Sequence, residues 1–150
     1  MKICILNERF LDGGLSNITK VVGKELSKKN DVFYYSMLNN VKNSKKFDDQ
    51  LYTTQSVFSG KSIFEKIYRK FIYFYFDKLN NKKVNFNLLY NNKIEEFSKF
   101  CNKESIDIVI LSGGLLTSFI PKIKESSPSL KFIAWQHNEA EIYFKKYYKN

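Results

Sequence analysis

The chain has 150 residues, of which 43% are hydrophobic and 17% aromatic, and its formal net charge is +10. A chain of this length can bury a core of its own, and it is too apolar to remain disordered. Because it contains two cysteines and a single histidine, we exclude a secreted disulfide scaffold and a zinc-stapled mini-domain.

The excess positive charge comes almost entirely from lysine, which supplies 23 of the 25 basic residues, the others being Arg9 and Arg69. Arginine is the usual side chain for bidentate recognition of phosphate and base edges, whereas lysine suits diffuse attraction to an anionic surface. We therefore expect no specific nucleic-acid partner. A coding bias toward Lys, Asn, Ile, Phe and Tyr is an alternative explanation of the same excess.

Targeting and membrane-spanning segments are not evident in the sequence. The apolar run 3–6 is shorter than the core of a signal peptide and is typical of a buried strand. The most apolar window, 71–76, is far shorter than the ~20 residues that a spanning helix needs. These features predict a cytoplasmic protein.

Apolar periodicity alternates between strand-like and helix-like runs along the first half of the chain. We expect a strand at 3–6, a helix at 15–29 and a strand at 32–35. A polar loop at 39–50 leads to an edge strand at 51–54. One apolar stripe of the helix should face the core: Leu15, Ile18, Val22 and Leu26.

Capping boxes mark two helix starts in the middle of the chain, because a hydroxyl or amide side chain precedes a glutamate by three positions. Ser62 and Glu65 open a helix that runs to about 78. After an asparagine-rich loop at 80–92, Asn92 and Glu95 open a helix to about 103. The elements that follow are a strand at 106–111, a helix at 115–125, a strand at 132–135 and a helix at 139–149.

Strands that alternate with helices predict an α/β fold, a Rossmann-like parallel sheet with helices on both faces, in a single domain spanning 1–150. In such sheets ligands bind at the carboxyl ends of the strands. The loops expected there are 7–16, 112–116 and 136–139, and we look for functional residues in them.

Adjacent glycines precede a predicted helix in two of these loops, as Gly13-Gly14 and Gly113-Gly114. Glycine lets a ligand approach the backbone closely, and a helix N-terminus attracts anions. Neither loop is a dinucleotide fingerprint or a Walker loop. A tight turn with Ser16 as N-cap also explains the first pair without a ligand, and a bare turn explains the second.

The third loop contains His137, the only histidine of the chain, directly before Asn138. Asn138 and Glu141 form a capping box, so a helix N-terminus follows, and its dipole keeps the imidazole neutral. A lone histidine is usually structural, but its place at the ligand edge makes His137 a candidate functional residue.

These motifs, in this order, resemble the N-terminal Rossmann-like domain of retaining, family-four glycosyltransferases with the GT-B fold. The matching features are the first strand at 2–6, the glycine pair, the strand at 107–110 and a strand that ends in histidine followed by Asn or Asp. The resemblance covers nearly the whole chain. It implies that His137 lines the sugar pocket as the catalytic residue. It also implies that the residues near the donor diphosphate or the acceptor are Gly13, Gly14, Asn17, Gly113, Gly114 and Asn138.

Two departures from the family pattern are visible. The family often has arginine three positions after the second glycine, where this chain has Asn17, so the expected phosphate clamp is weaker. Those enzymes also bind most of the sugar nucleotide through a second Rossmann-like domain, and this chain ends soon after the histidine loop. We therefore expect a missing C-terminal domain or a partner chain, with the sequence being a fragment, a truncated product or half of a split enzyme.

The predicted helix 62–78 combines an apolar face with basic residues and further aromatic side chains. A basic amphipathic helix with aromatics is typical of contact with a membrane surface. We expect Lys66, Arg69 and Lys70 to contact anionic lipid at the inner face of the cell membrane. A core helix with solvated lysines is the alternative.

The main hypothesis is the acceptor-side domain of a glycosyltransferase, which moves a hexose from a nucleoside diphosphate sugar to an envelope glycan, a lipid-linked sugar or a protein. We expect no metal, since no acidic cluster of the Asp-x-Asp type occurs, and no cofactor beyond the donor substrate. The alternative is a non-catalytic binding module that keeps the fold and pairs with a separate catalytic chain.

Overall fold

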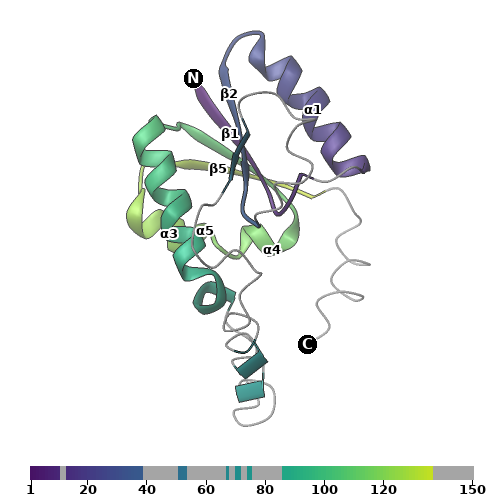
Figure 1. Cartoon of the computed structure of the whole chain (residues 1–150). Coiled ribbons are helices and arrows are strands. Elements are labelled where there is room, and N and C mark those ends of the chain that lie inside the picture. The colour runs from purple at the N-terminus through teal and green to yellow at the C-terminus, as the bar shows by residue number, and fades with distance from the viewer. Residues whose placement is uncertain are drawn as a thin grey trace.

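The computed structural model describes residues 1–10, 13–38, 51–53, 67, 70, 71, 74, 75 and 86–136. Within them, five parallel strands form one sheet in the order β3-β2-β1-β4-β5 (Figure 1). The strands are β1 (Lys2–Asn7), β2 (Asp31–Ser36), β3 (Leu51–Thr53), β4 (Ile108–Ser112) and β5 (Lys131–Trp135). The helices are α1 (Gly14–Ser27), α3 (Phe86–Glu104), α4 (Gly114–Thr117) and α5 (Ile120–Ser126).

The sheet is wound in two directions from its central strand, β1. The chain passes from β1 outward to β2 and β3, and it returns to the other side of β1 for β4 and β5. Helix α1 covers one face, and α3 and α5 cover the other (Figure 1). The expected α/β, Rossmann-like parallel sheet with helices on both faces is thereby confirmed. The strand order reverses between β1 and β4, which is where ligands bind in sheets of this kind.

The larger core lies between the sheet and the helices α3 and α5. Alternate strand residues point to this face, as the two-residue period of a strand requires, among them Cys4 and Leu6 on β1. The rings of Tyr35 on β2 and Phe97 on α3 meet edge to face, with centroids 4.8 Å apart. The helical side contributes Tyr90, Ile94, Phe97, Cys101, Leu116, Phe119 and Ile123, all buried.

Helix α1 packs on the opposite face through its smallest residues. Ser16, Thr19 and Gly23 are its buried positions. A Cβ atom at Gly23 would lie 2.7 Å from Cζ of Tyr34 on β2, so helix and strand approach more closely than a side chain would allow. The close approach explains why small residues, and not large apolar ones, occupy the buried face.

The apolar stripe predicted for this helix is wrong at Leu15 and Ile18, whereas Leu26 packs against the core as predicted. Leu15 is 38% and Ile18 46% exposed, while Val22 and Leu26 are half-buried. Ser16 lies in the first turn of the helix instead of capping it, because the N-cap residue is Gly13.

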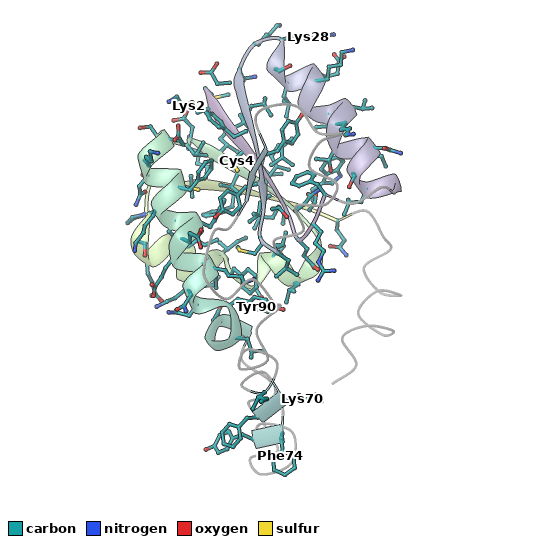
Figure 2. All side chains as sticks on the ribbon, in the orientation of Figure 1. Lys2, Cys4, Lys28, Lys70, Phe74 and Tyr90 are labelled. Atoms are coloured by element: carbon teal, nitrogen blue, oxygen red, sulfur yellow. The ribbon has the colours of Figure 1, made fainter. Side chains whose placement is uncertain are left out.

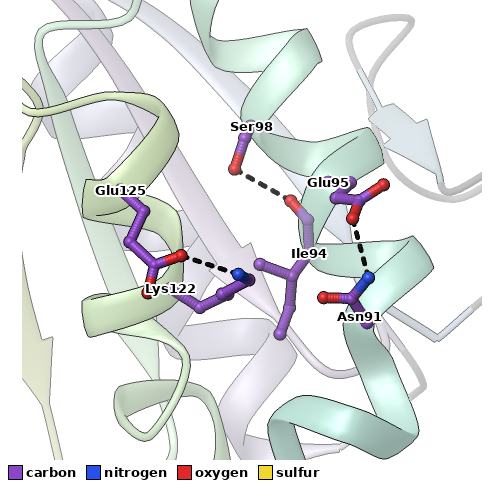
Figure 3. A network of polar contacts seen from close by, with 6 residues as sticks. All are labelled: Asn91, Ile94, Glu95, Ser98, Lys122 and Glu125. Carbon is purple, nitrogen blue, oxygen red and sulfur yellow. Dashed lines mark hydrogen bonds and ion pairs between the residues drawn. The ribbon is translucent and has the colours of Figure 1, made fainter.

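Helix α3 begins earlier than predicted, at Phe86, and Asn92 is an exposed residue inside it. The proposed capping box at Asn92 is wrong because the buried stripe starts before it, at Tyr90. Asn91 donates through Nδ2 to Oε1 of Glu95 at 2.7 Å, a pair one helical turn apart (Figure 3). In the same view Lys122 of α5, which pairs with Glu125 at 2.6 Å, lies beside α3.

The helix predicted at 115–125 is two helices. Helix α4 ends at Thr117 and α5 begins at Ile120, with Pro121 in its first turn. Proline lacks an N–H group and fits where a helix leaves that group unpaired, so it favours a new start here. Phe119 at the break is completely buried and anchors it to the core.

Among the described strands, β3 lies at one edge of the sheet, as predicted for the strand at 51–54, and β5 lies at the other. Ile133 of β5 is 51% exposed, although its neighbours in the same row, Ile110 and Ile5, are buried. The predicted loop 39–50 and the predicted helix 139–149 lie outside the described residues. Of the helices in the described part, none combines the length and the apolar character that crossing a membrane requires.

Candidate functional site

A row of polar residues closes the carboxyl ends of the central strands. Asn7 on β1 pairs in register with Ser36 on β2 and with Ser112 on β4, and Ser112 pairs with Trp135 on β5. Register partners in a parallel sheet point to the same face, which here is the face of α1. The first three members of this row are buried, with exposed fractions of 3% or less.

Two of these buried side chains have an oxygen without a hydrogen-bond partner. Asn7 donates through Nδ2 to Oγ1 of Thr19 on α1 at 3.3 Å, but its Oδ1 has no partner among the described residues. The same holds for Oγ of Ser112. A buried polar atom left unpaired costs about 1–3 kcal/mol, so an unpaired atom in a native core calls for an explanation. Both atoms lie at the edge where a ligand is expected.

Glu8 comes directly after Asn7 at this edge, and hydrogen bonds from the residues that follow β2 hold its backbone in place. Its carbonyl oxygen accepts from the amide of Leu38 at 2.8 Å, and that of Asn7 accepts from the amide of Met37 at 3.0 Å. The Glu8 side chain is half-buried, and within the described part no hydrogen bond or ion pair engages its carboxylate. Burial raises the pKa of Glu8, and the nearby charge of Arg9 lowers it by less.

The loop after β4 approaches this carboxylate. A Cβ atom at Gly113 would lie 3.9 Å from Oε1 of Glu8. Gly113 has a φ of 116°, which side chains other than glycine rarely adopt, and its amide donates to the carbonyl of Trp135 at 3.3 Å. The glycine here is therefore required by the backbone conformation, and its lack of a side chain leaves the Glu8 carboxylate uncovered on that side.

The first glycine pair lies at the N-terminus of α1, on the same edge of the sheet. Nothing described lies within 4 Å of a Cβ atom at Gly13 or Gly14, so packing does not require glycine at either position. No side chain caps the helix, and the carbonyl of Gly13 accepts from the amide of Asn17 at 3.1 Å. Among the described residues, none fills the space in front of either glycine.

The structure thus brings most of the predicted site residues to one edge. Gly13, Gly14, Gly113 and Gly114 all follow strands that end there, and Asn17 is exposed in the first turn of α1. The predicted catalytic His137 and its neighbour Asn138 lie outside the described residues. In the described part, no three side chains of His, Cys, Asp or Glu gather closely enough to hold a metal ion.

Three residues of this edge, Asn7, Glu8 and Ser112, lie in the predicted loops 7–16 and 112–116 but were not named as candidates from the sequence. A signal for two of them exists, since Asn7 and Ser112 each follow a run of apolar residues that forms a buried strand. A polar residue at the last buried position of such a strand faces the ligand edge. Only the pairing of β1 with β4, which the sequence does not reveal, shows that the two residues are neighbours.

A second surface lies on the segment predicted as a basic amphipathic helix. Residues 67, 70, 71 and 74 are helical, and Figure 2 shows Lys70 and Phe74 away from the sheet. Ile67, Phe71 and Phe74 are 58%, 64% and 56% exposed. Their spacing places them on one side of a helix, so the described apolar residues of this segment form an exposed stripe beside an exposed lysine. Lys66 and Arg69, the other expected membrane contacts, lie outside the described residues.

No family model, characterised protein or solved structure matches this chain.

Proposed function

We propose that this chain is the acceptor-side, N-terminal domain of a nucleotide-sugar-dependent glycosyltransferase of the GT-B fold. The acceptor is an envelope glycan, a lipid-linked sugar or a protein. The observation that carries the proposal is the polar cluster of Asn7, Glu8 and Ser112 at the reversal point of a doubly wound sheet. Among the described residues, Asn7 Oδ1, Ser112 Oγ and the Glu8 carboxylate have no hydrogen-bond partner. The two glycine loops flank this cluster, in which Asn7 and Ser112 are buried and Glu8 is half-buried.

In this function the domain binds and orients the acceptor, and a second domain binds the donor diphosphate. Glu8 is half-buried with a raised pKa, which suits a group that exchanges a hydrogen bond or a proton with an acceptor hydroxyl. The resemblance to family-four enzymes adds His137 at the sugar. In this proposal the described residues form the acceptor side of the site, and the donor side belongs to the second domain.

The experiment is deletion of the gene in its native cell, followed by compositional analysis of envelope glycans, lipid-linked sugars and glycoproteins. The expected result is the loss of one hexose from one of these fractions and its return with the wild-type gene. The His137→Ala gene should restore it less well. Unchanged glycans in the deletion strain contradict the proposal.

We also propose that the exposed stripe of Ile67, Phe71 and Phe74 contacts an anionic membrane. Aromatic and aliphatic side chains with exposed fractions above one half gain by entering the lipid interface. The charge is complementary, because Lys70 is exposed in the same stripe and the whole chain carries +10. Such contact would hold the acceptor edge near lipid-linked substrates.

A further inference from the structure

Strand β5 is the outer strand of the described sheet, and no described strand pairs with its other side. Two hydrogen bonds show which of its backbone groups face β4. The amide of Lys131 donates to the carbonyl of Asp107 at 3.1 Å, and the carbonyl of Trp135 accepts from the amide of Gly113 at 3.3 Å. The first and the last residue of the strand therefore direct their backbone groups inward, to β4 and the residues beside it.

The directions of the other backbone groups follow from this pattern. The N–H and C=O groups of one residue lie on the same side of a strand, and the side alternates from each residue to the next. Ile133 therefore also bonds to β4, whereas Phe132 and Ala134 point their amides and carbonyls away from the sheet. Within the described chain these four outward groups have no hydrogen-bond partner.

The side chains of β5 do little to prevent pairing at this edge. Proteins commonly protect a free edge with lysine, proline, a bulge or a very short strand. Strand β5 has five residues, and the charged one among them is Lys131, at its start. Ile133 is 51% exposed, and Ala134 is exposed as well. Burial of this edge against another strand would remove apolar surface from water.

We propose that β5 of one molecule pairs antiparallel with β5 of a second copy, about a two-fold axis at Ile133, so that two sheets join into one. This register pairs all five residues of each strand. Phe132 of each copy then lies opposite Ala134 of the other, and such a pair exchanges two hydrogen bonds. All four outward groups of each strand are thereby satisfied. The inference is independent of the proposed function.

The side chains are complementary in the same register. Ile133 lies opposite its own copy as a pair without hydrogen bonds between them, in which the Cα atoms approach to about 4.5 Å, so each isoleucine covers the other. On the other face of the sheet, the large Phe132 lies beside the small Ala134. Lys131 lies opposite Trp135 of the second copy, so no like charges meet, and an ammonium group beside an indole ring is favourable.

The test is sedimentation equilibrium of the complete chain at low and high salt. The contact is smaller than a standard interface, so we expect a reversible dimer with a dissociation constant of about 10–100 µM. Each molecule carries a net charge of +10, which opposes association. Raising NaCl from about 0.05 M to about 0.5 M screens this repulsion and should tighten the dimer. Association should stop at two molecules, because pairing uses the β5 edge of both.

Proline at position 134 tests the hydrogen bonds of the outer edge. Ala134→Pro removes an N–H group that points outward and leaves those that face β4, so the sheet of each molecule should be kept. The variant should raise the dissociation constant about tenfold or more, because two of the four hydrogen bonds between the copies are lost. Thermal unfolding of the variant shows whether each molecule still folds.

A pair of charged variants tests the register without relying on proline. Ile133→Lys and Ile133→Glu each place like charges opposite each other, so each variant alone should be monomeric. A mixture of the two should associate, since lysine then lies opposite glutamate. The matched control is Val21→Lys, which adds the same charge at a position of α1 that is 64% exposed and should leave the dimer unchanged.

Each outcome supports the inference or overturns it. A dimer that Ala134→Pro weakens, and that re-forms in the mixture of the two charged variants, supports pairing through β5. A monomer at all concentrations in both salts overturns it, and so do oligomers larger than a dimer. A dimer that neither charged variant weakens forms through another surface and overturns it as well. If Ala134→Pro does not fold, the charged pair decides alone.

Discussion

Asn7 and Ser112 lie directly opposite each other at the carboxyl ends of β1 and β4, and each has a buried oxygen without a partner within the described residues. Neighbouring strands of a parallel sheet rarely end in two such atoms by packing alone, because each costs free energy of folding. The free-energy cost of these unpaired oxygens can be measured without any ligand.

Ser112→Ala should leave the free energy of unfolding unchanged or raise it by about 1 kcal/mol, because an unpaired buried hydroxyl is removed. The control is Ser127→Ala. Ser127 is also buried, but its Oγ donates to Oδ1 of Asn102 at 2.8 Å, so its loss should destabilise by about 0.5–1.5 kcal/mol. Urea denaturation measures both. A destabilised Ser112→Ala variant would mean that the hydroxyl has a protein partner.

Gly14→Ala and Gly23→Ala should have opposite effects, although both replace a glycine of α1. Alanine at position 14 meets open space and gains helix propensity, up to about 1 kcal/mol. At position 23 the methyl group overlaps the ring of Tyr34, and the helix must move away from β2. Thermal unfolding compares them. Equal stabilities would show that α1 does not pack as closely as described.

Ser105→Gly should stabilise the protein by about 1 kcal/mol. Ser105 follows α3 with a φ of 55°, the left-handed conformation that costs a residue with a side chain free energy. The residue is exposed, so no packing is lost. The control is Ser105→Ala, which keeps the strained conformation and should not stabilise. A gain in both variants would point to an effect of the lost hydroxyl instead.

The two thiols should make the protein less stable at high pH. Burial raises the pKa of Cys101 to about 12 and that of Cys4 well above its usual range. Above about pH 9 the thiols ionise in the unfolded chain but not in the folded one, so the free energy of unfolding falls as pH rises toward the folded pKa. Each thiol contributes about 1.4 kcal/mol per pH unit at most.

The measurement is the free energy of unfolding between pH 8 and pH 11, approximate limits chosen to span the usual thiol range. In Cys101→Ala the free energy of unfolding should fall less steeply with pH, because one buried thiol has been removed. Lysines and tyrosines titrate in the same range, but they are present in both proteins, so their contribution cancels when the two curves are compared. Parallel curves for the two proteins would contradict the pKa assigned to Cys101.

Vesicle binding should depend on the exposed stripe. Replacing Phe71 and Phe74 by serine should weaken binding to phosphatidylglycerol-containing vesicles by about tenfold or more, since both side chains lose apolar contact. Lys70→Glu should weaken binding more at low salt than at high salt, because salt screens the attraction between lysine and anionic lipid. One such charge near the surface contributes about 1 kcal/mol. Co-sedimentation measures both effects.

Two controls define this experiment. Lys124→Glu changes an exposed lysine on α5 and has the same effect on net charge, so it separates the local contact from overall attraction. Pure phosphatidylcholine vesicles test the need for anionic lipid. Equal binding to both kinds of vesicle, or equal loss in Lys124→Glu and Lys70→Glu, would remove the proposed membrane contact.

The strands were predictable from the sequence because a buried parallel strand is a short, continuous apolar run. The runs at 3–6, 32–35 and 132–135 correspond to β1, β2 and β5. The face of α1 was not predictable by the same rule. Its sheet-facing positions are Ser16, Thr19 and Gly23, and only the close approach to Tyr34 explains them.

The candidate site was partly predictable for a related reason. Glycine pairs before helices are visible in the sequence, and the alternation of elements places them at one edge. Glu8 looks like any surface carboxylate in the sequence, and its importance follows from Gly113, more than 100 residues away, lying beside it. Contacts of this kind depend on strand order, which local patterns do not encode.

The exposure of Ile133 at the outer strand also bears on how the molecule behaves at high concentration. Within the described chain, β5 has a neighbour on one side only, and its free side presents amides and carbonyls next to a half-exposed isoleucine. Such an edge is a template on which another strand can add. Within the described sheet β5 offers the longer edge for such pairing, since β3 at the other side is three residues long. Whatever completes the sheet beyond β5, whether another segment or another molecule, also governs resistance to aggregation.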